Sequence, residues 1–134
     1  MQINQLIEVG LIMEIFNEFC FDSAHYLPNL PDGHKCGRLH GHTYRVRIYV
    51  SGLVDEKMGW IIDFGDITKV VRPVIDELDH RLLNEIEGLE NPTSENIARW
   101  VWQRLENLLS GLCKVEIRET HSTGCAYSGE KPVN

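Results

Sequence analysis

The sequence predicts a single α+β domain built on an antiparallel sheet. Three observations lead to this class: two stretches of alternating side chains near the N-terminus, two amphipathic stretches with helical spacing in the middle, and renewed alternation near the C-terminus. With 134 residues, 43% of them hydrophobic, the chain can build one core, and no repeat or linker divides it. We therefore expect one domain over residues 13–134 with the order ββααββ, preceded by an N-terminal extension over residues 1–12.

The first two strands are predicted over residues 13–22 (MEIFNEFCFD) and 43–50 (TYRVRIYV), where apolar and aromatic side chains alternate with polar ones. The segment between them contains two prolines and three glycines, which are typical of a loop. The pattern predicts two strands joined by a long connection.

The middle of the chain predicts two helices. Apolar side chains recur every three or four residues from Ile67 to Leu78, which indicates one buried helical face. Pro73 lies inside this stretch, so we expect either a bend there or a helix that starts late. Residues 92–95 (PTSE) offer a hydroxyl cap and an acid for the first turn of a second helix, whose apolar spacing continues up to Gly111.

Two further strands are predicted after the second helix. Alternation returns over residues 113–120 (CKVEIRET), and residues 124–128 (GCAYS) are expected to form a short last strand. These strands complete an antiparallel sheet.

Charge and composition exclude several classes of partner. The chain has 20 acidic and 13 basic residues, and this net charge of −7 argues against a general nucleic-acid or membrane surface. It has neither the features of a signal peptide at its start nor an apolar run long enough to span a bilayer, so we expect a cytoplasmic protein. The four cysteines lack CxxC spacing, and we expect free thiols.

Polar side chains share the apolar face of the predicted strands. Residues two apart on a strand point the same way, so His40 and His42 face the side of Val46. By the same parity His25 follows the inward face of the first strand, and Glu119 follows that of the third. Burying such groups without partners costs several kcal/mol, so this face requires a metal, a ligand or an internal network.

A metal is the first of these alternatives. Two histidines at i and i+2 on a strand can reach one ion, and His25 supplies a third ligand, which leaves the fourth position of a zinc site open. A lone His-x-His is more often part of a surface loop, but the inward parity and His25 favour the metal. Cys36 is either a fourth ligand, which would close the site, or a base or nucleophile beside the metal.

Two more places carry candidate chemistry, each with a plainer alternative. Asp79 and His80 follow the first predicted helix, and they form either a simple helix terminus or a proton shuttle in which the aspartate orients the histidine. Glu119 forms either an ion pair with Arg118 or Arg45 or an acceptor for two N–H donors of a planar ligand.

Six separated motifs together resemble one enzyme family. In chain order they are Phe21-Asp22-Ser23-Ala24-His25, Cys36-x-x-x-His40-Gly41-His42, Asp63-Phe64, Leu78-Asp79-His80-x-x-Leu83-Asn84, Asn91-Pro92-Thr93-x-Glu95-Asn96 and Glu119-Thr120. This set, which runs from about residue 13 to residue 129, is similar to the 6-pyruvoyl-tetrahydropterin synthase family.

The resemblance implies a T-fold, also called a tunnelling fold. In this fold a four-stranded antiparallel sheet carries two helices on one face, and the sheets of several subunits join into a barrel. The family typically forms a homohexamer made of two trimers, with active sites between subunits. Cys36 stands four residues before His40, which resembles the branch of 6-carboxy-5,6,7,8-tetrahydropterin synthases in queuosine biosynthesis. Another branch carries a glutamate near this position, but residues 37–39 include no acid.

The resemblance also implies roles for individual residues. The zinc ligands would be His25, His40 and His42, and Cys36 would be the base that removes a proton from the substrate. Bound zinc would polarise the hydroxyls of the substrate side chain and make the adjacent C–H bond acidic.

The remaining implied roles concern proton transfer and substrate binding. Asp79 and His80 would form the proton relay, and Glu119 with Thr120 would hold the pterin ring. Lys35 or Arg38, or a basic residue of another subunit, would meet the triphosphate of the substrate.

The reaction implied by the branch converts 7,8-dihydroneopterin triphosphate to 6-carboxy-5,6,7,8-tetrahydropterin, with release of acetaldehyde and triphosphate. One alternative is a sibling enzyme that makes 6-pyruvoyl-tetrahydropterin or acts on a related pterin. The alternative of another class is a non-catalytic zinc-binding module, such as a cupin-like barrel. A cupin requires a glutamate four or five residues after the second histidine, where this chain has Val46 and Arg47.

Overall fold

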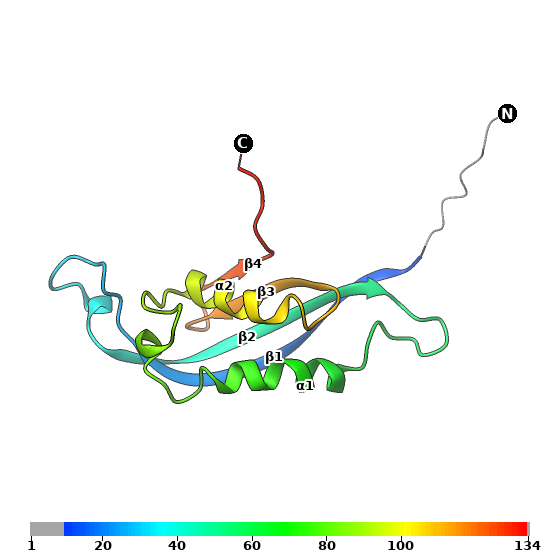
Figure 1. Cartoon of the computed structure of the whole chain (residues 1–134), viewed down its shortest axis with the longest axis horizontal. Coiled ribbons are helices and arrows are strands. Elements are labelled where there is room, and N and C mark those ends of the chain that lie inside the picture. Colours follow the sequence, from blue (N-terminus) through cyan, green and yellow to red (C-terminus); the bar gives the residue numbers. More distant parts are fainter. Residues whose placement is uncertain (1–9, 134) are drawn as a thin grey trace.

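The computed structural model describes residues 10–133, which form one four-stranded antiparallel sheet in the spatial order β1-β2-β3-β4 (Figure 1). Strands β1 (Ile12–His25) and β2 (His40–Leu53) form a long hairpin, and β3 (Leu112–Arg118) and β4 (Gly124–Tyr127) complete the sheet. The predicted antiparallel α+β architecture is confirmed.

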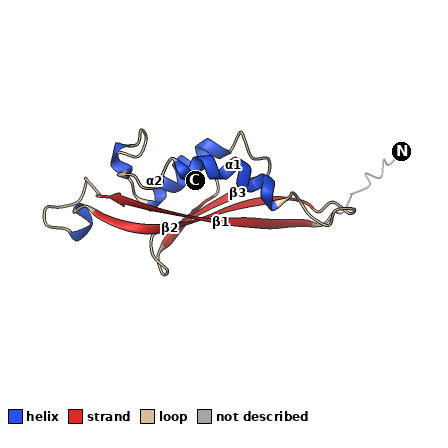
Figure 2. Cartoon of the chain, turned by 90° about the horizontal axis from the view of Figure 1, so that it is seen from below, coloured by secondary structure: helices blue, strands red, loops and turns tan. Residues whose placement is uncertain are grey.

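Two helices lie on one face of the sheet (Figure 2). Helix α1 (Phe64–Asp76) begins after Asp63, whose carboxylate accepts a hydrogen bond from the backbone N–H of Gly65. Helix α2 (Ser94–Leu105) begins after Thr93, whose hydroxyl accepts one from the N–H of Asn96, as the cap in the sequence predicts. Two short 3-10 helices, Lys35–Gly37 and Leu83–Glu85, lie in the connections.

Two predicted helix boundaries need correction. A late start of α1 at Pro73 is excluded, because the Asp63 cap starts the helix nine residues earlier and the exposed proline lies inside it. Helix α2 does not continue to Gly111 but ends at Leu105, and turn hydrogen bonds from the N–H groups of Leu108 and Leu109 to the Leu105 carbonyl follow.

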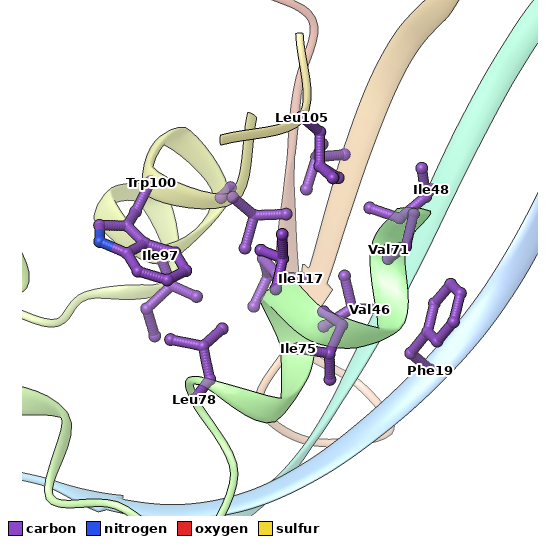
Figure 3. Close-up of a cluster of buried hydrophobic side chains, with 14 of the residues drawn as sticks. Phe19, Val46, Ile48, Val71, Ile75, Leu78, Ile97, Trp100, Leu105 and Ile117 are labelled. Carbon is purple, nitrogen blue, oxygen red and sulfur yellow. The ribbon is translucent and has the colours of Figure 1, made fainter. Parts of the chain in front are cut away.

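The core lies between the sheet and the helices (Figure 3). The inward-facing strand residues, among them Phe19, Val46 and Ile117, are buried in one cluster with Val71 and Ile75 of α1 and Leu105 of α2. The opposite face of the sheet carries no helix in the described part of the chain (Figure 2). Only one face of the sheet is therefore buried within the chain, as the alternation predicts.

Both strands of the hairpin extend farther than the alternation indicates. Strand β1 continues through Ser23 to His25, and β2 begins at His40. The predicted extension over residues 1–12 lies largely outside the described residues, although Ile12 pairs with Leu53 as the first residue of β1. No helix within residues 10–133 has the length and apolar character needed to cross a bilayer.

Candidate metal centre and active site

The hairpin register brings three histidines together at one end of the sheet. His25 is the last residue of β1 and pairs directly with His40, the first residue of β2. Ser23, one inward-facing position earlier on β1, pairs with His42. Each of the three histidines offers a ring nitrogen that lies within 4.8 Å of the others, so the structure forms the predicted cluster.

Hydrogen bonds fix which nitrogen of two of these rings faces the cluster. Nδ1 of His25 lies 2.8 Å from the carbonyl oxygen of Pro92, and Nδ1 of His40 lies 2.6 Å from that of Arg38. A carbonyl oxygen can only accept, so each Nδ1 carries the hydrogen and each Nε2 keeps a free lone pair. In metal-binding histidines, the ring nitrogen that does not bind the metal usually carries the hydrogen and donates it to an oxygen in this way.

The free nitrogens converge without satisfying one another. Nε2 of His25 lies 3.0 Å from Nε2 of His40, and in these tautomers neither atom has a hydrogen to donate. Nε2 of His42 is buried and has no hydrogen-bond partner among the described residues. Three lone pairs that face one another in a desolvated site repel one another, and a cation bound between them would relieve this repulsion.

The donor set fits zinc. A tetrahedral site with Zn–N bonds of about 2.0–2.1 Å separates its ligand nitrogens by roughly 3.3 Å, close to the spacing of His25 and His40. Burial lowers the pKa of His25 and of His42 below the usual value, so both rings are held in the neutral form that binds metal. Three neutral imidazoles leave one coordination position for substrate or water.

Glu119 stands directly beside this cluster. It follows the last residue of β3, and its Oε1 lies 3.9 Å from Nε2 of His25. The carboxylate also lines a cavity of about 240 Å³ together with Leu27, Thr93 at the start of α2, and Thr123 of the β3–β4 turn. Among the described residues Glu119 forms an ion pair with neither Arg118 nor Arg45, the two partners considered for it, and Arg118 pairs with Glu116.

Thr120 does not line that cavity. Its hydroxyl lies 2.6 Å from the hydroxyl of Thr123 and accepts hydrogen bonds from the N–H groups of Ser122 and Thr123. Within the described chain Thr120 thus shapes the β3–β4 turn beside Glu119.

Cys36 lies in the connection between the two strands that carry the histidines. It is half-buried within the 3-10 helix Lys35–Gly37, and its thiol is not part of the cluster of close donor atoms. The N–H of Leu27 donates a hydrogen bond to the carbonyl of Cys36. Within the segment, the N–H of Cys36 donates to Nδ1 of His34, which caps the 3-10 helix. The bond from Leu27 therefore ties the Cys36 segment to the end of β1, two residues beyond His25.

Asp79 and His80 form a pair of their own, in the turn after α1. The helix ends at Asp76, so both residues lie beyond its last turn. Oδ1 of Asp79 lies 2.9 Å from Nδ1 of His80 and accepts the N–H of Asp22, and these bonds lower the pKa of the Asp79 carboxyl. The His80 side chain is 79% exposed, and its backbone has a left-handed φ of 55°, held by a bond from its N–H to the Asp22 carbonyl.

Two contacts of the histidine cluster could not be predicted as such from the sequence. The Pro92 carbonyl comes from the start of α2, 67 residues from His25, and a backbone acceptor leaves no signal in a sequence. The phenol oxygen of Tyr44 lies 3.1 Å from the same Nδ1 of His25. Tyr44 lies two residues after His42 and faces the same side of β2 as His40 and His42. This spacing could have indicated that Tyr44 lies beside the cluster.

Comparisons with known proteins show the family of the chain. The family described as 6-pyruvoyl tetrahydropterin synthase matches residues 14–130. A 6-carboxy-5,6,7,8-tetrahydropterin synthase of Synechocystis sp. is 40% identical over 119 residues, covering 84% of this chain and 91% of that protein. A dihydroneopterin monophosphate aldolase of Pyrococcus furiosus is 41% identical over 96 residues, covering 72% of this chain and 77% of that protein.

A solved structure gives the same fold. The 6-pyruvoyl tetrahydropterin synthase of Caenorhabditis elegans superposes with a TM-score of 0.83 at 29% identity, covering 92% of this chain and 100% of that chain. Because the family match spans residues 14–130 and includes every residue of the histidine cluster, the chain belongs to the 6-pyruvoyl tetrahydropterin synthase family.

Proposed function

We propose that the chain is a zinc-dependent enzyme that converts 7,8-dihydroneopterin triphosphate and water to 6-carboxy-5,6,7,8-tetrahydropterin, acetaldehyde and triphosphate, as a step of queuosine biosynthesis. The observation that carries the proposal is the convergence of His25, His40 and His42, with an unpartnered nitrogen on His42. The synthase from Synechocystis sp., 40% identical, supports this choice of reaction.

The three histidines would hold zinc, which would supply Lewis-acid polarisation of the hydroxyls of the substrate side chain. The protein's part is to keep the rings neutral and oriented. The Pro92 and Arg38 carbonyls hold the hydrogens of His25 and His40 on the outer nitrogens, and burial keeps His42 unprotonated.

Cys36 would remove the proton from the carbon next to a bound hydroxyl. The backbone supports this placement, because Leu27 is two residues beyond His25 and bonds to the carbonyl of Cys36, and Arg38 bonds to His40. The cysteine segment is therefore tied to both strands that carry the ligands.

Glu119 would accept two N–H hydrogen bonds from the amino-pyrimidinone edge of the pterin. Its position on the wall of a cavity and beside His25 supports this role, since one end of a bound pterin would then lie near the metal. A charged acceptor makes such bonds about twice as strong as a neutral one. Thr120 would contribute by holding the turn next to Glu119.

Asp79 and His80 would supply protons to the site of a neighbouring subunit in a hexamer of two trimers. Their exposure and their contacts with Asp22 rather than with the metal cluster support a site shared between chains. The sheet face without helices and the apolar Phe16 side chain on it, 45% exposed, offer a surface for such assembly.

Mixing two inactive variants tests this sharing. If Cys36 and His80 of one site come from different subunits, hexamers assembled from equal amounts of Cys36→Ala and His80→Ala chains recover roughly one quarter of the wild-type activity, because roughly one quarter of the sites then combine two intact residues. If both come from one subunit, the mixed hexamers stay inactive.

One assay distinguishes the proposed reaction from its rivals. Zinc-loaded protein is incubated with 7,8-dihydroneopterin triphosphate and, separately, with the monophosphate, and the pterin and aldehyde products are identified by mass. We expect acetaldehyde and a 6-carboxylated pterin from the triphosphate.

Other products would assign the chain differently. A 6-pyruvoyl product would show the sibling synthase. Cleavage of the monophosphate without acetaldehyde would show an aldolase, a candidate that the 41% identity to the Pyrococcus furiosus protein favours. Zinc binding without turnover of either pterin would leave a non-catalytic zinc module and would refute both enzyme functions.

A further inference from the structure

Tyr44 is a buried tyrosine whose hydroxyl reaches the metal centre from the core side. The side chain is fully buried, and its ring stacks on Phe21 with centroids 4.7 Å apart and planes 10° from parallel. This stacking fixes the ring, so the phenol oxygen has one position. That oxygen lies 3.1 Å from Nδ1 of His25.

Tyr44 contacts two of the three histidines. Its ring lies edge-on to that of His42, with centroids 5.4 Å apart, and edge-on to that of His25 at 5.9 Å. Nδ1 of His25 has two acceptors within hydrogen-bond distance, the Pro92 carbonyl at 2.8 Å and the Tyr44 oxygen at 3.1 Å. Turning the His25 ring over would lose both bonds at once.

We infer that Tyr44 is a positioning residue that locks the ring and tautomer of His25, so that its Nε2 lone pair stays directed at the metal. The inference rests on the proposed zinc site. It assigns Tyr44 no contact with substrate and no part in proton transfer; the hydroxyl acts only through His25.

The test compares Tyr44→Phe with Tyr49→Phe. Tyr49 lies on the same strand, and its hydroxyl also makes one side-chain bond, to Glu116, but on the half-buried opposite face. Zinc affinity of each metal-free protein is measured by competition with a chromophoric chelator, and the visible spectrum of bound Co²⁺ reports the ligand geometry. Urea unfolding of the metal-free proteins shows whether the fold is kept.

We expect Tyr44→Phe to bind zinc about 10-fold more weakly than wild type and to alter the Co²⁺ spectrum, as loss of an outer-shell partner does. Tyr49→Phe should bind zinc as wild type does. Equal zinc affinity and equal spectra in the two variants would overturn the inference. Failure of wild type to bind zinc would instead refute the proposed function.

A second measurement does not depend on any variant or on zinc. Imidazole ¹⁵N shifts of the metal-free wild type report the tautomer of His25, and we expect the hydrogen on Nδ1. A hydrogen on Nε2 would overturn the inference even if Tyr44→Phe proved too unstable to study.

Discussion

Replacing His42 by leucine should stabilise the metal-free protein while it abolishes tight zinc binding. Nε2 of His42 is buried without a partner, and such a group typically costs about 1–3 kcal/mol of folding free energy. Leucine has a similar volume and no polar atom, so it removes this cost and keeps most of the packing. Because the His42 ring is only partly buried, we expect the low end, a gain of about 1 kcal/mol.

The effect on zinc has the opposite sign. The free energy of zinc binding to structural sites in proteins is about 10 kcal/mol or more, and divided over three ligands this is about 3 kcal/mol for each. Loss of one ligand should therefore weaken zinc binding more than 100-fold. His121→Leu, which removes an exposed histidine from the β3–β4 turn, is the matched control and should change neither quantity.

The assay is urea unfolding in the presence of a chelator, at one protein concentration for all variants, followed by zinc titration of the folded proteins. A His42→Leu protein that is no more stable than wild type without metal, or that binds zinc as tightly as His121→Leu does, would refute this prediction.

Three other predictions follow from the site. Cys36→Ala should lower kcat by about 10²- to 10⁴-fold with little change in KM or zinc content. The control variant Cys20→Ala, which removes an exposed thiol from the other face of β1, should keep full activity. Full activity of Cys36→Ala would exclude Cys36 as the base. Glu119→Gln should lower kcat/KM by about 30-fold, mainly through KM, because one charged acceptor is lost, and an unchanged KM in steady-state kinetics would exclude Glu119 as the pterin anchor. Burial lowers the folded-state pKa of His25 and His42, so the unfolded chain binds more protons than the folded chain does. The free energy of unfolding of the metal-free protein should therefore be highest above about pH 6.5 and fall as the pH drops through the folded-state pKa. Urea unfolding that shows higher stability on acidification over this range would contradict the assignment.

Side-chain alternation made the cluster of three histidines predictable from the sequence. His40, His42 and the buried residues of β2 share one parity, and His25 shares that of β1, so a correct strand assignment placed all three on one face. The strand ends were missed because Ser23 and His25 are polar and broke the apolar alternation. Their burial depends on partners from elsewhere, such as the Leu78 carbonyl that accepts the Ser23 hydroxyl bond.

Contacts between distant segments could not be predicted. The Pro92 carbonyl is brought to His25 by the packing of the α2 start, and no residue type marks a carbonyl. Asp79 was placed at a helix end, but α1 stops at Asp76 and leaves Asp79 in a turn bonded to Asp22. In each case tertiary packing, rather than local propensity, sets the position.

X-ray absorption at the zinc edge reports which atoms the histidine cluster gives to the metal. For the zinc-loaded wild type, we expect about three imidazole nitrogens and one oxygen at about 2.0–2.1 Å. We also expect loss of imidazole scattering in His42→Leu. A sulfur neighbour at about 2.3 Å would contradict the proposed site, because Cys36 would then be a ligand and not the base.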